Sequence, residues 1–290
     1  MAFKPHPNGG GLVEDTAYVA QTAYVGKYAV VRDKARVLDN ARIDDFAMVL
    51  GNVLIHDTAQ VSDNARVYGE ARISSEAMVY GDAQVYGRAR IYGSATVFGN
   101  AKIFDNAMVF DDASVHGAAQ VYGAAQVYGD AGVFVEAWVF GDAKVYGNAK
   151  VYGNVSLYEI AKVYGSAEVC GKSKIYGNAC VSGNAWVLDE ARVYDNSWVM
   201  GNARASGKAN IYGNAKIFDD ARVSGEAQIY GDAKISGNVW VYGAAKVYFN
   251  AKVSGKARVY DDGEISGNAV VSGDAVVSGE TRIDSGSHTI

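Results

Sequence analysis

Apolar and polar residues alternate along the chain with a period of six. From Val13 to Ile283 every sixth residue is Val, Ile or Leu, and Ala205 is the one exception among 46 positions. The residue two positions earlier is Ala at 38 of 45 places. Because side chains at i and i+2 lie on the same face of a strand, each of these units predicts a short strand with one buried face.

A turn is predicted after each strand. The hexapeptide follows the pattern Ala-x-Val/Ile-Tyr/Phe/Ser-Gly/Asp-Asn/Asp. Gly tolerates a positive φ, and Asn and Asp side chains bond to nearby backbone, so the last two positions predict a corner. The period continues from residue 13 to residue 283 without an insertion or a deletion. We therefore predict an all-β solenoid with no inserted loops.

A second pattern indicates how many strands make one coil. The residue after each core aliphatic is aromatic at 23 of 33 positions from Tyr68 to Tyr260. Sorting every third repeat gives one row that is aromatic at 11 of 11 positions and two rows at 6 of 11, whereas sorting every second repeat separates nothing. We therefore predict three strands and 18 residues per coil, a triangular cross-section and about 15 coils.

The complete aromatic row is the candidate interaction face. It comprises Tyr68, Tyr86, Phe104, Tyr122, Phe140, Tyr158, Tyr176, Tyr194, Tyr212, Tyr230 and Tyr248. Toward the N-terminus the same face carries Leu12, Val30, Met48 and Leu50. Such a row either stabilises the sheet by stacking or forms a docking surface. As docking partner we favour a second copy of the chain; a linear glycan is the alternative, and nucleic acid is disfavoured.

The hexapeptide resembles that of a known superfamily. Segments 103–108 (Ile-Phe-Asp-Asn-Ala-Met) and 211–216 (Ile-Tyr-Gly-Asn-Ala-Lys) place an aliphatic residue four positions before a small one. This pattern, which covers residues 13–283, resembles the hexapeptide-repeat, left-handed parallel β-helix superfamily, and most closely its bacterial proteins labelled as transferases. The resemblance implies a left-handed coil and, as an alternative function, an enzyme similar to the trimeric acyltransferases. The aromatic residue after the aliphatic departs from the family's usual small or acidic one.

Candidate catalytic residues are few. His6 and His288 lie near the chain ends, whereas His56 and His116 fall on different faces. An acyl-transfer base needs an orienting partner and a pocket, and a repeat without inserted loops offers neither within one chain. The carbonic anhydrases of this fold need three converging histidines, which two central ones do not supply. We therefore predict no catalytic, cofactor-binding or metal-binding residue, and a structural role in preference to an enzymatic one.

Corner carboxylates and the two cysteines have no predicted function. Of the 32 acidic residues, 27 lie at corners, Asp33, Asp105 and Asp111 among them, and we expect these to be solvated. No single loop collects the several oxygens that a dedicated calcium site requires. Cys170 and Cys180 are expected to point outward from different faces, too far apart for a disulfide, as free thiols.

Composition and charge narrow the class of protein. The chain has 34 Gly but 2 Pro, and its formal net charge of -5 gives no reason to expect a polyanion as a general partner. No apolar run approaches the roughly 18 residues that span a bilayer, and the first residues lack an apolar signal core. Two cysteines are compatible with a reducing compartment. We expect a cytoplasmic protein, or one assembled into a particle without a Sec signal.

The sequence predicts three parts and one main function. Residues 1–12 form an irregular N-terminal cap, residues 13–283 form the β-helix of 46 hexapeptides, and residues 284–290 form a polar tail. An uncovered C-terminal coil offers strand edges for end-to-end stacking. The expected function is a structural or scaffold solenoid that self-associates as a homo-oligomer or filament. The alternatives are an acyltransferase-like enzyme and a glycan-binding rod of a phage or cell-surface appendage.

Overall fold

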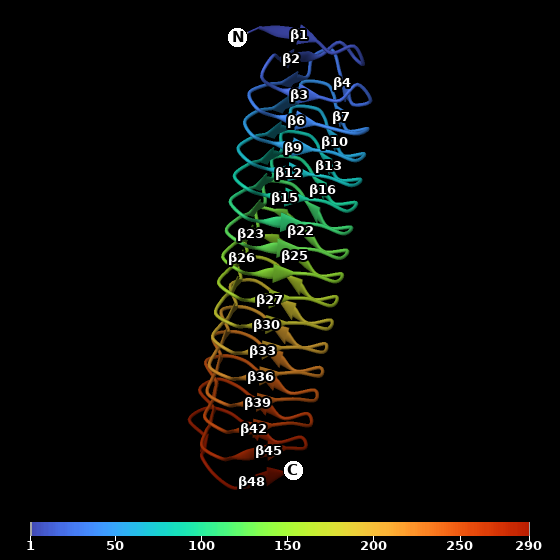
Figure 1. Ribbon diagram of the computed structural model, residues 1–290. Helices are drawn as coiled ribbons and strands as arrows, with labels where there is room; N and C mark the ends of the chain where they lie inside the picture. The colour runs from blue at the N-terminus through green and yellow to red at the C-terminus, as the bar shows by residue number, and fades with distance from the viewer. Residues whose placement is uncertain (1, 290) are drawn as a thin grey trace. The chain divides into compact units, whose positions relative to one another are not determined.

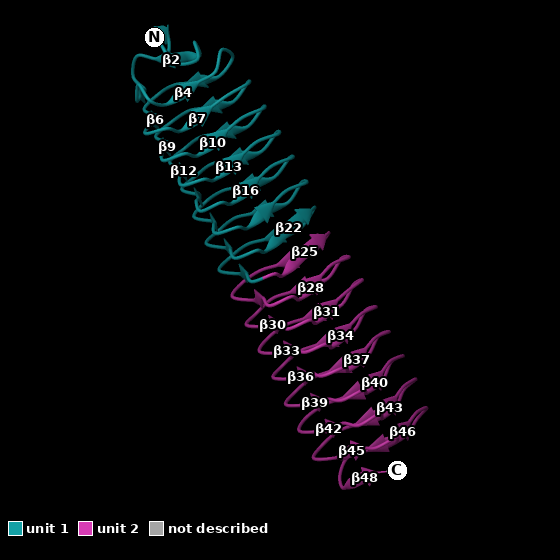
Figure 2. Ribbon diagram, turned by 90° about the vertical axis from the view of Figure 1, so that its right-hand side faces the viewer, with its two compact units in different colours: residues 1–147 teal, residues 148–290 magenta. Residues whose placement is uncertain are grey.

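The computed structural model describes residues 2–289, which contain strands but no helix (Figure 1). The chain divides into two compact units, Met1–Gly147 and Asn148–Ile290 (Figure 2). Each unit is a parallel β-solenoid with three sheets, which we call A, B and C. The same letter marks strands of the two units that are separated by multiples of 18 residues. The predicted fold class, with three strands and 18 residues per coil, is confirmed.

The first unit contains strands β1 to β24. Its sheet A comprises β1 (Phe3–Pro5), β2 (Leu12–Glu14), β5 (Val30–Val31), β8 (Met48–Val49), β11 (Arg66–Val67), β14 (Gln84–Val85), β17 (Lys102–Ile103), β20 (Gln120–Val121) and β23 (Trp138–Val139). Its sheet B comprises β3 (Tyr18–Val19), β6 (Arg36–Val37), β9 (Leu54–Ile55), β12 (Arg72–Ile73), β15 (Arg90–Ile91), β18 (Met108–Val109), β21 (Gln126–Val127) and β24 (Lys144–Val145). Its sheet C comprises β4 (Tyr24–Val25), β7 (Arg42–Ile43), β10 (Gln60–Val61), β13 (Met78–Val79), β16 (Thr96–Val97), β19 (Ser114–Val115) and β22 (Gly132–Val135).

The second unit contains strands β25 to β48. Its sheet A comprises β26 (Ser156–Leu157), β29 (Lys174–Ile175), β32 (Arg192–Val193), β35 (Asn210–Ile211), β38 (Gln228–Ile229), β41 (Lys246–Val247), β44 (Glu264–Ile265) and β47 (Arg282–Ile283). Its sheet B comprises β27 (Lys162–Val163), β30 (Cys180–Val181), β33 (Trp198–Val199), β36 (Lys216–Ile217), β39 (Lys234–Ile235), β42 (Lys252–Val253), β45 (Val270–Ser272) and β48 (Ser287–Thr289). Its sheet C comprises β25 (Lys150–Gly153), β28 (Glu168–Val169), β31 (Trp186–Val187), β34 (Arg204–Ala205), β37 (Arg222–Val223), β40 (Trp240–Val241), β43 (Arg258–Val259) and β46 (Val276–Val277).

Parallel pairing without a register shift aligns equivalent positions of successive coils. On sheet A, for example, Gln84 pairs with Lys102 and Val85 with Ile103, 18 residues apart. The aliphatic positions point inward, and Ile103 and the preceding Ala101 are both completely buried. Burial of each Val or Ile contributes about 1.5–3 kcal/mol, and each coil gains it by packing on its neighbours. The outward positions therefore form columns whose members lie about 4.8 Å apart.

The corners use glycine and aspartate for one geometric requirement. Their first residue has a positive φ, 67° at Gly87 and 58° at Asp105 in the next coil. Glycine adopts this conformation without strain, whereas aspartate stabilises it by local hydrogen bonding.

The carboxylates of these aspartates bind the backbone of the following coil. Asp33 Oδ2 accepts a hydrogen bond from the Gly51 N–H at 2.9 Å, and Asp219 Oδ2 from the Gly237 N–H at 3.0 Å. The same contact is made by Asp39, Asp45, Asp57, Asp63, Asp105, Asp111, Glu159, Asp189 and Asp195. Corner carboxylates that we expected to be merely solvated thus satisfy backbone donors that the parallel sheets leave over.

Both chain ends contain strands that the sequence analysis did not anticipate. Within the expected irregular cap, β1 pairs antiparallel with β2. Residues 8–11 lie beside β4. There the Gly11 N–H donates to Val25 O at 2.9 Å, and the Val25 N–H donates to Asn8 O at 3.0 Å. Within the expected polar tail, β48 pairs parallel with β45. Both segments make backbone hydrogen bonds to a sheet edge, although neither follows the hexapeptide pattern.

Candidate functional site

The interaction face lies along sheet A in both units. Each of its residues directly follows a buried core residue, so its side chain points outward at the start of a corner. Five members belong to the first unit and are Tyr68, Tyr86, Phe104, Tyr122 and Phe140. Six belong to the second unit and are Tyr158, Tyr176, Tyr194, Tyr212, Tyr230 and Tyr248. The in-register strands place consecutive members side by side within each unit.

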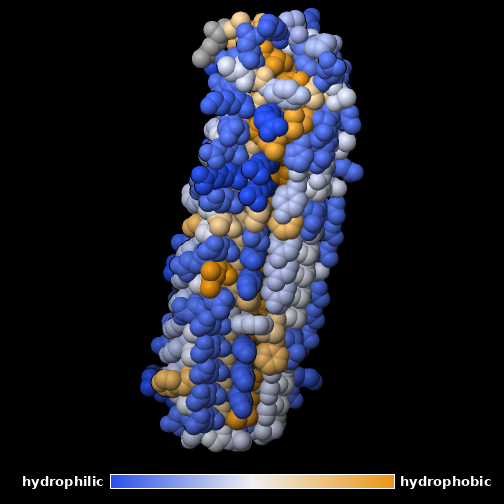
Figure 3. All heavy atoms as spheres, viewed as in Figure 1, coloured by the Kyte–Doolittle hydropathy of each residue, from blue (hydrophilic) through white to orange (hydrophobic). Residues whose placement is uncertain are grey.

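The rings of the interaction face form stacked ladders. In the first unit the ring centroids are 4.8 Å apart for Tyr68 and Tyr86, and 4.7 Å for Phe104 and Tyr122. In the second unit the stacked neighbours from Tyr158 to Tyr248 have centroids 4.8–5.0 Å apart. The ring planes are nearly parallel, and the distance between their centroids exceeds the ~3.5 Å contact distance of carbon atoms. The rings are therefore offset rather than superposed. Side chains stacked in columns of this kind are visible on the surface (Figure 3).

Stacking leaves the ring edges, but not the ring faces, for a partner. All members are partly buried, because each interior ring has a neighbour on both of its faces. Burial raises the pKa of the Tyr122 and Tyr212 hydroxyls above the usual value. Burial, together with the neighbouring tyrosines, raises the pKa of Tyr194 to about 12. These hydroxyls therefore stay protonated at neutral pH and keep their ability to donate hydrogen bonds.

Further ladders lie outside the interaction face, among them Tyr242 stacked on Tyr260 on sheet C of the second unit. On sheet B of the first unit the stacked rings are Tyr92, Phe110, Tyr128 and Tyr146. On sheet C of the same unit they are Tyr80, Phe98, His116 and Phe134. Aromatic stacking is thus a general feature of these corners. The interaction face is distinguished by its lack of gaps, because the other columns are interrupted by residues such as Ser182 and Ser224.

A hollow lined by both apolar and polar residues lies on sheet A near the N-terminal end of the first unit. Its volume is about 550 Å³. It is lined by Tyr28, Val30, Phe46, Met48, Asn64, Arg66, Asp82 and Gln84. Tyr28 and Phe46 stack at 5.2 Å and remain 58% and 60% exposed. Hydrophobic side chains also gather near this end in the space-filling view (Figure 3).

A hollow of mixed charge lies beside the interaction face in the second unit. Its volume is about 460 Å³. It is lined by Glu190, Arg192, Lys208, Asn210, Glu226, Gln228, Ala244, Lys246 and Asp262. Lys208 Nζ lies 3.6 Å from Glu226 Oε1, so acidic and basic side chains alternate along this edge.

The histidines do not form a catalytic arrangement with one another. His116 is stacked between Phe98 and Phe134 on sheet C, with ring centroids 4.6 and 4.9 Å away, and burial lowers its pKa. His6 Nδ1 lies 3.1 Å from Asn8 O within the N-terminal cap, and His288 Nε2 lies 3.2 Å from Ser285 O. A ring held between two aromatic faces is a packing element rather than an oriented general base.

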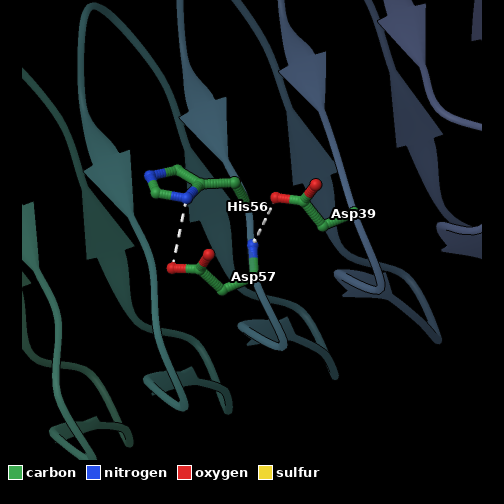
Figure 4. A group of neighbouring side chains, drawn as sticks. All are labelled: Asp39, His56 and Asp57. Atoms are coloured by element: carbon green, nitrogen blue, oxygen red, sulfur yellow. Dashed lines mark hydrogen bonds and ion pairs between the residues drawn. The ribbon is translucent and has the colours of Figure 1, made fainter.

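His56 has carboxylate neighbours that the sequence analysis missed. Its Nδ1 lies 3.2 Å from Asp57 Oδ2, and Asp39 Oδ2 accepts a hydrogen bond from the Asp57 N–H at 3.1 Å (Figure 4). These three residues each offer a ligand atom within 4.8 Å of the others. The sequence signal for this cluster was the 18-residue spacing of Asp39 and Asp57, because that spacing places the two carboxylates on adjacent coils. Both carboxylates already bind backbone N–H groups, which favours a corner contact over a dedicated metal site.

The two cysteines are free, and they differ in burial. Cys180 is only 7% exposed although it occupies an outward position, where it pairs in register with Lys162 and Trp198. The bulk of neighbouring side chains explains this departure from the expected exposed thiol. Burial raises the pKa of both thiols, which disfavours the reactive thiolate.

Comparison with known proteins finds a similar repeat. The family model described as YdcK Beta solenoid repeat matches residues 59–75, 83–99, 101–117, 173–189, 227–243 and 265–279. These segments lie in both units and make up about a third of the chain. A search of curated proteins returns no match. The chain is therefore similar to this β-solenoid repeat, and the match does not extend to the hexapeptide-repeat acyltransferases.

Within residues 2–289 there is no helix that could cross a membrane.

Proposed function

We propose that the chain is a non-enzymatic scaffold solenoid whose interaction face binds a second copy of the chain. The observation that carries this proposal is the gapless ladder of Tyr and Phe on sheet A of each unit. Solenoid stability requires only the buried columns, and serine occupies the equivalent outward position in many other coils. An uninterrupted aromatic column exceeds that requirement. Tyrosine is also enriched in protein interfaces, where it combines an apolar ring with a polar tip.

The surroundings of the ladder favour a second copy as the partner. The hollow beside sheet A of the second unit alternates Glu190 and Glu226 with Arg192 and Lys246. In a two-fold interface the same patch meets itself, so a surface with both signs of charge can be self-complementary. The exposed rings of Tyr28 and Phe46, beside the hollow near the N-terminal end, would add a hydrophobic contact.

The chain ends favour a lateral contact over head-to-tail stacking. At the N-terminal end, β1 covers β2 and residues 8–11 cover β4. At the other end β46, β47 and β48 are the last strands of their sheets in the described part of the chain. A head-to-tail contact would have to displace the N-terminal cap, which costs its backbone hydrogen bonds. We therefore place the self-contact on the interaction face.

The alternative functions receive less support from the geometry. A sugar ring or a nucleic-acid base stacks on an aromatic face, and in the ladders those faces are occupied by neighbouring rings. An acyltransferase-like enzyme would need an oriented base in a pocket, whereas His116 is packed between two phenylalanines.

Solution mass tests the proposal. In the double variant Tyr122→Ser/Tyr212→Ser, one ring is removed from the interaction face of each unit. Interface tyrosines are frequent hot spots, so we expect the dissociation constant of the dimer to rise at least about tenfold above that of the wild type. Sedimentation equilibrium over a concentration series measures the dissociation constant of the dimer.

A matched variant distinguishes a specific interface from a general loss of stacking. Tyr128→Ser/Tyr242→Ser removes one ring per unit from ladders outside the interaction face. We expect it to associate like the wild type. The proposed interface is refuted if the wild type is monomeric at all concentrations, or if both double variants weaken association equally.

A further inference from the structure

Four arginines surround one hollow on sheet B of the first unit. The hollow has a volume of about 180 Å³, and Arg36, Arg72, Arg88 and Arg90 line it together with Glu70. Four positive charges against one negative charge make a strongly basic site. This excess is notable in a chain whose formal net charge is -5.

The register of sheet B places two of these arginines side by side. Arg72 on β12 pairs in register with Arg90 on β15, about 4.8 Å away along the sheet. Like charges directly opposite each other on adjacent strands destabilise a sheet. Nothing in the fold requires arginine here, because the outward position of the same column is Met108 and then Gln126 in the following coils.

Local carboxylates leave most of this charge unpaired. Arg88 Nε donates to Glu70 Oε2 at 3.0 Å, which occupies one edge of its guanidinium group. Within residues 2–289, neither Arg36 nor Arg72 nor Arg90 makes an ion pair or a side-chain hydrogen bond.

Acidic corner residues on the opposite edge of sheet B bind backbone groups rather than these arginines. There, Asp39 and Asp57 bind backbone N–H groups of the next coil. Three guanidinium groups are thus available to an external ligand.

We propose that this hollow binds a phosphate group. The planar guanidinium fork matches phosphate oxygens in a bidentate geometry, and adjacent arginines can hold two faces of the same tetrahedral anion. A hollow of about 180 Å³ has room for the five heavy atoms of a phosphate. The Asn52 side chain in the lining adds a neutral polar group. The anion would relieve the repulsion between Arg72 and Arg90.

Isothermal titration calorimetry with inorganic phosphate tests the site. We expect saturable binding by the wild type, with potassium chloride at matched ionic strength as the reference. Arg72→Gln/Arg90→Gln should weaken binding by about a hundredfold, because a hydrogen-bonded charge contributes about tenfold or more at each position. Glutamine occupies the outward position in other coils, such as Gln126 on β21, so the variant keeps a residue that the sheet accommodates.

The second unit supplies the matched control. Lys216 and Lys234 also pair in register on sheet B, so Lys216→Gln/Lys234→Gln removes two like charges without altering the hollow. We expect this variant to bind phosphate like the wild type. A site in the hollow is refuted by non-saturable binding to the wild type, by unchanged binding to the arginine variant, or by equal weakening in the lysine variant.

Two additional measurements assign the source of the phosphate and exclude misfolding. If glycerol 3-phosphate binds more tightly than inorganic phosphate, the natural ligand of the site is an organic phosphate. Equal binding of the two would assign free phosphate as the ligand. Without phosphate, thermal unfolding of the arginine variant should occur at the wild-type temperature or above it, because a like-charge pair has been removed. Phosphate should raise the unfolding temperature of the wild type and of the lysine variant more than that of the arginine variant, and an equal rise in the arginine variant would contradict the proposed site.

Discussion

Aspartate at a corner performs two tasks that substitutions can separate. Asp219 has a φ of 57°, and its Oδ2 accepts a hydrogen bond from the Gly237 N–H at 3.0 Å. Gly201 and Gly237, one coil before and one coil after it, have φ values of 69° and 71°. Asp219→Ala removes the carboxylate but keeps a Cβ in the left-handed region, whereas Asp219→Gly removes both. The two variants therefore differ only in backbone strain and chain flexibility.

The expected magnitudes follow from these contacts. Loss of an exposed hydrogen bond to the backbone costs about 1 kcal/mol in both variants. Alanine adds the cost of the left-handed conformation, about 1–2 kcal/mol, which local hydrogen bonding eases for aspartate. Glycine avoids that cost but gives the unfolded chain about 0.4–1 kcal/mol of extra entropy. We expect Asp219→Ala to lose about 2 kcal/mol of unfolding free energy, and Asp219→Gly to be about 0.5–1 kcal/mol more stable than the alanine variant.

Urea denaturation measures these differences. Far-UV circular dichroism reports on the sheets, and fluorescence reports on Trp198 and Trp240 of the same unit. Coincident transitions from the two probes are required before free energies are compared, because repeat proteins can lose cooperativity. An alanine variant as stable as the wild type, or as stable as the glycine variant, would refute the double role of the corner aspartate.

Two further predictions concern the core and the acid limit of stability. Ile103 is completely buried, so Ile103→Val should cost about 0.5–1.5 kcal/mol and Ile103→Ala about 2–5 kcal/mol in urea unfolding; equal losses would contradict close packing of the coil. The hydrogen bond from the Ser75 N–H, with a smaller contribution from His56, lowers the pKa of Asp57. Because the folded pKa lies below the unfolded value of about 3.9, this contribution is present above that pH and is lost as the pH falls through the folded pKa. Thermal unfolding between pH 7 and pH 3 should therefore show a smaller loss of stability in Asp57→Asn than in the wild type, and parallel curves would contradict this assignment.

The architecture could be predicted from the sequence because the buried columns tolerate almost no variation. Val121 and Ile103 are both completely enclosed, and a polar or missing residue at such a position would disturb two neighbouring coils. The three-strand coil was visible in the aromatic row from Tyr68 to Tyr248, because residues 18 apart share a column. Regular spacing thus converts a one-dimensional pattern into a unique register. The handedness of the coil, which only the family resemblance implies, stays a prediction.

The contacts around the sites could not be predicted in the same way, because they depend on where flexible side chains lie. The corner pattern showed aspartate at Asp33 and Asp219, but not that the carboxylate reaches the backbone of the next coil. The aromatic row predicted neighbouring rings, but not that stacking covers their faces. Arg72 and Arg90 directly precede core residues, which places them on the outer face, yet their hollow depends on Arg88, which belongs to a corner rather than to the strand pattern.

The fold itself separates the two proposed sites and thereby makes them independent tests. The interaction face follows sheet A, whereas the arginine hollow lies on sheet B of the first unit. Mutations at sites without shared partners usually add, so Tyr122→Ser/Tyr212→Ser should leave phosphate binding unchanged, and Arg72→Gln/Arg90→Gln should leave the association constant unchanged. If phosphate instead shifts the association of the wild type but not of the arginine variant, the hollow must contribute to the contact between copies. Self-association would then have to be assigned to the sheet B surface rather than to the aromatic ladder alone.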